Sequence, residues 1–259
     1  MSTSSSADPR EGDYDWASGW YGGKTVLVTG GTSGIGAAIS SAFVKAGAKV
    51  VSVGAFAHEV ETLESNPDYD GRSLRVLDVR DNDAVKDLLG AFSSLDVLVN
   101  CAGVIRRGAE HDPEVFDDVV NINLSGTMRM CTAARPLLAA GGTGSIVNLA
   151  SMLSIFGGGL VPGYSASKGG VAQLTKSLAI AYAGNNIRVN AVAPGWIATP
   201  LTGALREDET RSQAILERTP LNRWGQPDDI AGAVLFLCSP AARFITGAML
   251  TIDGGYSIA

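Results

Sequence analysis

The chain has 259 residues, 46% of them hydrophobic and 32 of them glycine without a collagen-like period, so a fibrous or disordered protein is excluded. Its net charge of −6 argues against nucleic acid or an anionic membrane as the main partner, since both reward a basic surface. The three cysteines are far apart, which indicates reduced thiols, and neither they nor the two histidines have metal-site spacing. Without a signal peptide or a membrane span, we expect a cytoplasmic protein that binds no metal.

Residues 1–23 begin as a polar, serine-rich stretch and then become rich in aromatic residues between Tyr14 and Tyr21. The aromatic rings could dock on the rest of the chain or on a neighbouring subunit. We expect an N-terminal extension that is partly ordered at best. One domain should follow over 24–259, because no linker interrupts that region.

From residue 24 onward, short apolar runs alternate with segments of helical periodicity. The apolar runs, predicted to be strands, lie at 25–29, 49–53, 74–77, 96–99, 145–149, 187–192 and 248–252. The helical segments lie at 35–46, 81–92, 112–139, 163–183 and 227–237. Strands that are apolar on both faces and alternate with helices are typical of a parallel sheet covered on both sides. We therefore predict an α/β fold: a single doubly wound (Rossmann-type) domain with a seven-stranded parallel sheet.

Residues 196–226 interrupt this alternation with a charged segment of helix-forming residues between a strand and the next helix. Open α/β sheets bind ligands beyond the carboxyl ends of their strands, which is where this insertion would lie. We expect a substrate-binding loop or lid, with a plain surface helix as the alternative.

The first predicted strand ends in a glycine-rich turn that leads into a helix. Gly30, Gly34 and Gly36 have the spacing for a tight turn, for close approach of the backbone to a pyrophosphate, and for packing of helix on strand. The helix N-terminus would offer free N–H groups to the phosphates. The turn therefore predicts a dinucleotide site; a turn that serves only packing is the alternative.

The end of the second predicted strand bears on which dinucleotide is bound. Gly54-Ala55-Phe56 carries neither the acidic residue that usually binds the adenosine ribose nor an arginine. The glycine-rich turn also lacks a lysine or arginine for a 2′-phosphate, so we expect NAD, with NADP less favoured. Asp78, which precedes Val79 after the third predicted strand, could accept a hydrogen bond from the adenine amino group or cap a helix.

A second group of residues points to catalysis. Tyr164 and Lys168 lie four residues apart in a helical segment, so their side chains share one face. Ser151 follows the fifth predicted strand at the edge where the ligand crevice is expected, and Asn123 lies within 112–139. The Tyr-x-x-x-Lys spacing is common by itself. Combined with the glycine turn and the order Asn, Ser, Tyr, Lys, it predicts an active site.

Over residues 24–259 the sequence resembles the short-chain dehydrogenase/reductase family. The matching motifs are TGGTSGIG at 29–36, Asn100-Cys101-Ala102-Gly103, Asn123, Ser151, Tyr164-Ser-Ala-Ser-Lys168, Pro194-Gly195 with Thr199, and Asp253-Gly254-Gly255. Cys101 stands where the family usually has a second asparagine. Gly54-Ala55 replaces the usual cofactor-discriminating side chain.

The resemblance implies an NAD(P)-dependent oxidoreductase with Tyr164 as general acid/base. Lys168 and the positive nicotinamide ring would lower the pKa of Tyr164, and Lys168 would also bind the nicotinamide ribose. Ser151 would bond the substrate oxygen, and Asn123 would hold a water between Lys168 and solvent. The implied cofactor-binding positions are Gly30, Thr32, Ser33, Gly34, Ile35, Gly36, Gly54, Asp78, Val79, Asn100, Ala102, Gly103, Tyr164, Lys168, Pro194, Gly195, Ile197 and Thr199. Because the family is usually tetrameric, we expect a homotetramer.

Four shorter pieces resemble sugar-acid dehydrogenases of the 2-deoxy-D-gluconate or 2-keto-3-deoxygluconate type: 102–107, 150–154, 161–164 and 223–225. Arg106 and Arg107 would follow the fourth strand beside the crevice, where a guanidinium can clamp a carboxylate. Solvation, or pairing with Glu110 or Asp112, is the alternative. The expected substrate-binding residues are Arg106, Arg107, Ser151, Met152 and Tyr164.

The predicted reaction is hydride transfer between a nicotinamide cofactor and a secondary alcohol or ketone of a small hydroxylated substrate, with a sugar acid preferred. The alternatives are another carbonyl substrate, such as an acyl thioester, a terpenoid alcohol or a neutral sugar, and a dinucleotide-binding protein without catalysis. The complete Asn, Ser, Tyr, Lys set disfavours the last alternative, since a non-enzyme needs no ionisable tyrosine at that spacing.

Overall fold

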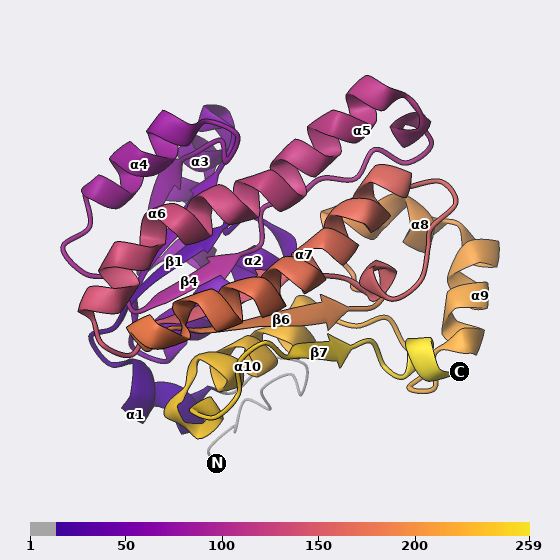
Figure 1. Ribbon diagram of the computed structural model, residues 1–259. Helices are drawn as coiled ribbons and strands as arrows, with labels where there is room; N and C mark the ends of the chain where they lie inside the picture. Colours follow the sequence, from indigo (N-terminus) through magenta and orange to yellow (C-terminus); the bar gives the residue numbers. More distant parts are fainter. Residues whose placement is uncertain (1–13) are drawn as a thin grey trace, which may run out of the picture.

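A computed structural model describes residues 14–259 (Figure 1), so the first thirteen residues of the expected extension lie outside the described part. Seven parallel strands form one sheet in the order β3-β2-β1-β4-β5-β6-β7. The strands are β1 (Thr25–Thr29), β2 (Lys49–Gly54), β3 (Arg72–Val76), β4 (Val97–Asn100), β5 (Ser145–Leu149), β6 (Arg188–Pro194) and β7 (Met249–Ile252). The prediction of a Rossmann-type α/β fold with a seven-stranded parallel sheet is confirmed.

The order of strands places a ligand crevice at the middle of the sheet. Successive strands extend outward from β1 on one side and from β4 on the other, so the chain changes direction between these two strands. Thr29 at the end of β1 pairs with Asn100 of β4, which in turn pairs with Asn148 of β5. The carboxyl ends of the three central strands therefore lie level with one another.

Helices cover both faces of the sheet, because the central strands are apolar on both sides. On one face α2 (Gly34–Lys45) and α10 (Pro227–Cys238) pack on each other and on the strands. On the other face α4 (Asn82–Gly90), α6 (Gly126–Ala140) and α7 (Pro162–Tyr182) enclose a second apolar core, and Figure 1 shows α6 and α7 crossing in front of the strands. The other helices are α1 (Ser18–Tyr21), α3 (Ala57–Glu64), α5 (Pro113–Val120), α8 (Gly203–Glu207) and α9 (Glu209–Arg218).

The segment 112–139, predicted as one helix, is interrupted by a π-helical turn. This turn, Asn121–Ser125, separates α5 from α6. The buried positions from Val119 to Leu138 take one residue more than five ideal turns of 3.6 residues require, and the π turn absorbs it. The helical segment predicted at 112–139 is therefore present, and apolar spacing does not reveal the extra residue within it.

Helix α3 was not predicted from the sequence. Among its residues only Val60 is buried, so it lacks the apolar periodicity that marks the other helices. Helices α8 and α9 lie within the insertion 196–226, and Figure 1 shows them beyond the arrowheads of β6 and β7. No helix within residues 14–259 combines the length and the apolar character needed to cross a membrane.

Residues 14–23 pack against the sheet domain through two tyrosines. Tyr14 and Tyr21 are buried, with 4% and 2% of their surface exposed. The Tyr14 hydroxyl donates to Oδ1 of Asp228 at 3.1 Å, and the Tyr21 hydroxyl donates to the Leu235 carbonyl. Both partners belong to α10, so this segment is held to the outer surface of that helix.

Candidate active site

A cavity of about 390 Å³ opens where β1, β4, β5 and β6 end. Among the predicted cofactor-binding residues, those that line it are Gly30, Ser33, Gly34, Ile35, Gly36, Gly103, Tyr164, Lys168, Pro194, Gly195, Ile197 and Thr199. Those that do not line it are Thr32, Gly54, Asp78, Val79, Asn100 and Ala102. The glycine turn and the catalytic motif, more than a hundred residues apart in sequence, thus share one cavity.

The glycine turn forms a shallow cradle that fits a pyrophosphate. Gly30 and Gly34 have φ angles of +63° and +52°, which other residues rarely adopt. A Cβ atom on Gly36 would lie 2.1 Å from the Gly30 carbonyl oxygen, and one on Gly30 would lie 2.9 Å from the Ala102 nitrogen. Helix α2 begins here, and its N-cap residue Ser33 makes no side-chain capping bond. The first N–H groups of α2 are therefore available to an anion.

Gly54, at the end of β2, contacts Thr32 and not the cavity. A Cβ atom on Gly54 would lie 2.7 Å from both Oγ1 and Cγ2 of Thr32. The Thr32 side chain therefore occupies the space that a larger residue at position 54 would need. This contact explains why β2 ends without the acidic residue that often binds the adenosine ribose.

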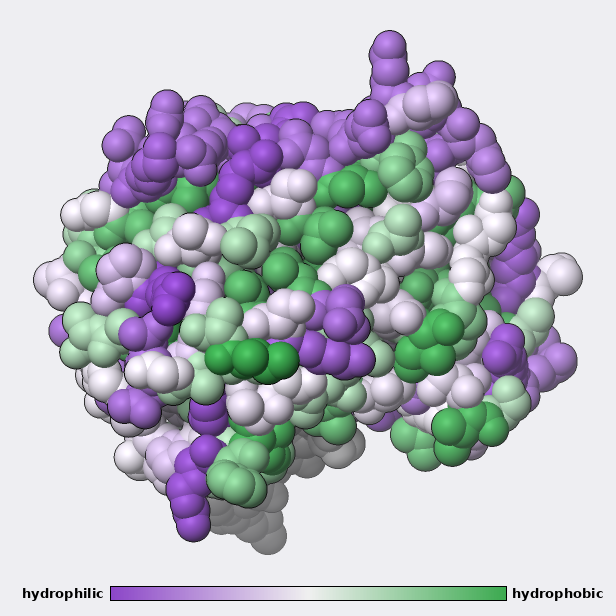
Figure 2. All heavy atoms as spheres, viewed as in Figure 1, coloured by the Kyte–Doolittle hydropathy of each residue, from purple (hydrophilic) through white to green (hydrophobic). Residues whose placement is uncertain are grey.

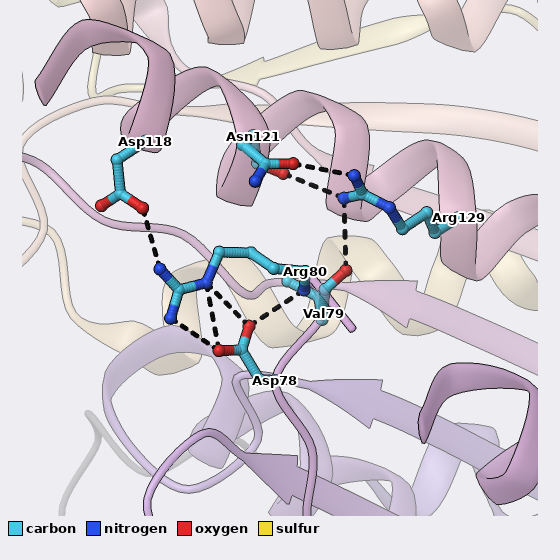
Figure 3. Close-up of polar contacts among 6 residues, drawn as sticks. All are labelled: Asp78, Val79, Arg80, Asp118, Asn121 and Arg129. Carbon is cyan, nitrogen blue, oxygen red and sulfur yellow. Dashed lines mark hydrogen bonds and ion pairs between the residues drawn. The ribbon is translucent and has the colours of Figure 1, made fainter. Parts of the chain in front are cut away.

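Asp78 lies in an ion-pair network after β3 (Figure 3). Arg80 Nη2 lies 2.7 Å from Asp78 Oδ2, and Arg80 Nη1 lies 2.9 Å from Asp118 Oδ1 on α5. Hydrogen bonds from Arg80 hold the pKa of Asp78 below its usual range, so this side chain stays charged. Asp78 does not cap a helix, since the N-cap of α4 is Asp81.

Val79 is tied to the π-helical turn by an arginine of α6. Arg129 donates through Nη1 to the Val79 carbonyl at 3.5 Å and through Nη2 to Oδ1 of Asn121 at 2.8 Å (Figure 3). Val79 is also buried against Gly126, where a Cβ atom would lie 2.6 Å from its Cγ2. The loop after β3 is therefore fixed against the start of α6.

Asn100 and Ala102 stabilise the chain where β4 ends. Asn100 Nδ2 donates to Oδ1 of Asn148 at 2.9 Å and lies 3.3 Å from Cys131 Sγ. The Ala102 N–H donates to Oγ1 of Thr29 at 3.1 Å. These bonds hold the end of β4 to its neighbours β5 and β1 beneath the cavity.

Ser151, Tyr164 and Lys168 meet within the cavity, as expected from their motif. Ser151 lies close enough to Tyr164 to lower the pKa of its hydroxyl. Lys168 Nζ lies 5.6 Å from the centre of the Tyr164 ring and donates to the Leu149 carbonyl at 2.6 Å. The hydroxyl group of Tyr164 thus has a polar partner on one side and an ammonium group nearby.

Burial dominates the electrostatics of this group. It lowers the pKa of Lys168, which is 4% exposed, to about 8. It also raises the pKa of Tyr164; Ser151 lowers this pKa, and the charge of Glu110 raises it. In the ligand-free chain burial has the largest effect on the pKa of Tyr164, and the expectation that Lys168 and the nicotinamide ring lower it stays a prediction.

Glu110 belongs to the site although the sequence did not assign it there. Its side chain is buried, with 1% exposed. Oε2 accepts the Tyr164 N–H at 2.7 Å, and Oε1 accepts the Arg106 N–H at 2.7 Å. A carboxylate at the N-terminus of α7 is favoured by the helix dipole. Glu110 therefore joins the loop after β4 to α7, the helix that carries Tyr164.

Asn123 binds the same loop from the π-helical turn. Its Oδ1 accepts the Val104 N–H at 2.8 Å, and its Nδ2 donates to the Val104 carbonyl at 3.0 Å and to Ser167 Oγ at 3.0 Å. The amide pairs with Val104 as another peptide group would. Ser167, on α7, had no predicted role, and only the fold reveals that it completes this link.

A second cavity, of about 290 Å³, shares five lining residues with the first: Ser151, Tyr164, Gly195, Leu201 and Thr202. Its other lining residues are Ile105, Arg107, Met152, Leu153, Trp196, Ala204, Leu205 and Arg211. Arg107 and Met152 were predicted to bind substrate. Arg211 was not, because a charged helix gives no sign of which face it turns toward a cavity.

Arg106 is not among the residues that line this cavity. Its side chain is exposed, while its backbone N–H is held by Glu110. The expectation that both arginines reach the substrate is therefore met for Arg107 alone. Among the described residues, neither guanidinium forms an ion pair with Glu110 or Asp112.

Comparisons with known proteins identify the family to which the chain belongs. A family model described as enoyl-(acyl carrier protein) reductase matches residues 30–257. The 2-dehydro-3-deoxy-D-gluconate 5-dehydrogenase of Pseudoalteromonas atlantica is 42% identical over 243 residues, which cover 90% of this chain and 96% of that protein. The chain belongs to the short-chain dehydrogenase/reductase family. The resemblance inferred from its motifs is confirmed, and this short-chain dehydrogenase/reductase is a nicotinamide-dependent oxidoreductase that acts on a small molecule.

Solved structures resemble this short-chain dehydrogenase/reductase closely. One is an Agrobacterium tumefaciens protein described as a 2-deoxy-D-gluconate 3-dehydrogenase with bound NADP. It is 44% identical, with a TM-score of 0.84, and the match covers 92% of this chain and 98% of that one. The other is a gluconate 5-dehydrogenase from Burkholderia cenocepacia in complex with NADP and tartrate, at 31% identity and a TM-score of 0.86, covering 93% and 97%.

Proposed function

We propose that the protein is a sugar-acid dehydrogenase that transfers a hydride between NAD and a secondary alcohol or ketone of its substrate. The observation that carries this proposal is the second cavity, where Arg107 and Arg211 line the space beside Ser151 and Tyr164, and no carboxylate within 14–259 does. In a chain of net charge −6, two guanidinium groups beside the reacting side chains favour an anionic substrate. The names of the relatives described above support the same substrate class.

The proposed chemistry centres on Tyr164. During oxidation its phenolate takes the proton of the substrate hydroxyl, and during reduction its hydroxyl returns that proton. Ser151 donates to the same oxygen and stabilises charge there. Lys168, with a pKa of about 8, is mostly protonated at neutral pH and favours the phenolate. A nicotinamide cofactor held by the residues of the first cavity would supply the hydride chemistry, and the positive charge of its oxidised form would favour the Tyr164 phenolate.

The cofactor would be held mainly by backbone. The N–H groups at the start of α2 would bind the pyrophosphate, Lys168 the nicotinamide ribose, and Thr199 the carboxamide. NAD is favoured over NADP because neither the glycine turn at 29–36 nor Gly54-Ala55-Phe56 carries a lysine or arginine that could bind a 2′-phosphate.

Asn123 would act mainly by positioning its neighbours. Both hydrogens of its amide are used by Val104 and Ser167. A water between Asn123 and Lys168 would therefore bond the remaining lone pair of Oδ1 or the backbone carbonyl. We expect removal of this amide to disturb the loop after β4 together with any proton path.

We expect the enzyme to work as a cytoplasmic homotetramer. The face formed by α6 and α7 is largely white and green in Figure 2, whereas the edge over α4 and α5 is purple. Met128 of α6 and Ile180 of α7 are 39% and 81% exposed, and Phe244 and Ile258 near the C-terminus are also exposed. Light scattering of the purified protein tests the assembly, and Ile180→Arg should reduce the mass if this face is an interface. The free thiols support a reducing compartment.

The decisive experiment is a substrate screen with a matched pair of variants. Purified protein is assayed with sugar acids, neutral sugars, secondary alcohols and acyl thioesters, each with NAD and NADP. We expect turnover of sugar acids with NAD. Tyr164→Phe should still bind NADH, measured by fluorescence, but lose about 10²- to 10⁴-fold in kcat. Tyr182→Phe, on the same helix, should retain activity. Turnover of neutral substrates alone would refute the proposed substrate class, and an active Tyr164→Phe would refute the mechanism.

A further inference from the structure

Arg211 is a charged residue of the second cavity that has almost no fixed partner. It lies on α9, within the insertion, whereas Arg107 comes from the loop after β4. Its Nε lies 3.2 Å from Asp208 Oδ2, and the two side chains are 58% and 41% exposed. The Nη groups have no hydrogen-bond partner among the described residues. Four of the five N–H donors of this guanidinium are therefore free for a ligand.

The backbone that carries Arg211 is well anchored, in contrast to its side chain. Asp208 caps α9, with its Oδ1 accepting the Arg211 N–H at 3.1 Å. On the next residue, Ser212 Oγ accepts the indole N–H of Trp224 at 2.9 Å, and Ile215 is buried. The helix therefore presents Arg211 to the cavity at a fixed place and leaves the guanidinium free to move.

We propose that Arg211 and Arg107 together bind the carboxylate of the substrate, so that α9 selects acidic substrates. This inference rests on the proposed function and adds the residue and the element that recognise the charge. The substrate carboxylate would replace Asp208 as the partner of Arg211, since an exposed ion pair between residues three apart is weak. Two guanidinium groups from different elements can bind a planar carboxylate through paired N–H donors.

Two other arginines of the insertion allow recognition by Arg211 to be distinguished from a general effect of positive charge. Arg206, on α8, is exposed and does not line the cavity. Arg218, on α9 itself, is stacked over Tyr256 at 4.4 Å from the ring centre. Recognition by α9 therefore depends on Arg211 and not on the charge of the insertion as a whole.

The test compares an acid with its neutral counterpart, D-gluconate with D-glucitol, or the preferred sugar acid from the screen with the matching polyol. Arg211→Gln should raise KM for the acid about tenfold or more, because a hydrogen bond to a charged group is lost. Both kcat and the thermal midpoint should stay near those of the parent protein, and KM for the polyol should not change. Arg211→Lys should recover part of the loss. Asp208→Asn, which keeps the cap but releases Arg211, should lower KM for the acid.

Arg206→Gln is the matched control, because it removes the same charge from the neighbouring helix, and its kinetic constants should equal those of the parent. The inference is overturned if Arg211→Gln leaves KM for the acid within twofold, or if it raises KM for acid and polyol alike. In either case the parent protein still oxidises the acid, so the proposed function survives. If the parent protein turns over no sugar acid, the proposed function and the inference are both overturned.

Discussion

The carboxylate of Glu110 accepts the backbone N–H of Tyr164 at 2.7 Å. The same buried side chain accepts the N–H of Arg106, next to the cavity-lining Arg107. One carboxylate thus links Tyr164, the proposed general acid/base, to the loop that borders the second cavity. Its negative charge also raises the pKa of the Tyr164 hydroxyl, because a nearby anion disfavours the phenolate.

Replacing Glu110 with glutamine should shift the pH dependence of the enzyme. Without the charge, the pKa of Tyr164 falls, so alcohol oxidation should reach half its maximal rate at a lower pH. The glutamine amide also turns an NH₂ group toward one of the two N–H donors, which should reduce the free energy of unfolding by about 1–3 kcal/mol. The profile of kcat/KM against pH and urea denaturation measure the two effects.

Glu114→Gln is the control for this variant, because Glu114 is exposed at the start of α5. It should change neither the pH profile nor the stability. An unchanged or alkaline-shifted profile in Glu110→Gln would show that the carboxylate does not act on the Tyr164 hydroxyl.

Two glycine-to-alanine substitutions should have opposite effects on stability. Gly54→Ala would place a Cβ atom 2.7 Å from the Thr32 side chain, so we expect a loss of about 1–3 kcal/mol. Gly90, in α4, has open space around it, so Gly90→Ala should stabilise the protein by about 0.5–1 kcal/mol. Urea denaturation gives both values. Equal effects would mean that the Thr32 contact does not constrain position 54.

The same contact predicts how cofactor preference can be changed. Gly54→Asp alone should weaken NADH binding, because the new side chain collides with Thr32. Combined with Thr32→Gly, the aspartate has room to bond the adenosine ribose, so the double variant should favour NADH over NADPH more strongly than the parent. Fluorescence titration of both nucleotides tests this, and a double variant no better than Gly54→Asp would contradict it.

The free energy of unfolding of the ligand-free protein should depend on pH through the titration of Lys168. Its pKa falls from 10.5 to about 8 on folding, so between these values the unfolded chain binds more protons than the folded one. The contribution of Lys168 to stability should therefore rise with pH across this window, by up to about 1.4 kcal/mol per unit. The difference in unfolding free energy between the parent and Lys168→Met, measured on both sides of about pH 8, isolates this effect. A difference that is independent of pH would show that burial does not perturb the lysine.

Tyr21 should prove to be part of the folding unit. Its ring packs edge-on against Phe43 with 5.0 Å between ring centres, and its hydroxyl bonds α10. Tyr21→Ala should cost about 3–5 kcal/mol, as for other large buried aromatics. Trp16, in the same segment, is 48% exposed, so Trp16→Ala should cost much less. Thermal unfolding of the two variants compares them directly, and equal small losses would show that residues 14–23 only rest on the surface.

The sequence predicted the sheet well because most of its strands, such as β1 and β4, carry continuous apolar runs that alternate with helical segments. It also predicted the residues that meet in the catalytic cavity, since Ser151 and Tyr164 belong to motifs with a fixed order. It did not reveal Glu110 or Arg211. The sequence suggests Glu110 only as a partner for Arg106 or Arg107, and no motif marks Arg211 within the insertion 196–226. Only the fold shows that Glu110 is buried and that Arg211 lines a cavity.

Arg106 and Arg107 illustrate the same limit. Adjacent arginines are equivalent in a sequence, but a loop can turn only one of two neighbours into a given cavity. Which of them enters depends on the hydrogen bond between Arg106 and Glu110, which is a tertiary contact. The sequence could therefore indicate that an arginine lies near the substrate, but not which of the two it is.

The contacts of Asn123 need the π-helical turn at Asn121–Ser125, whereas the apolar core does not. Because the turn absorbs one extra residue, the helices on either side keep their apolar faces on the core. A chain that lost one residue there could form a straight helix with the same buried contacts. It would, however, turn the Asn123 amide away from Val104 and Ser167. Selection on the site, not on the core, would then be what preserves the extra residue in this turn.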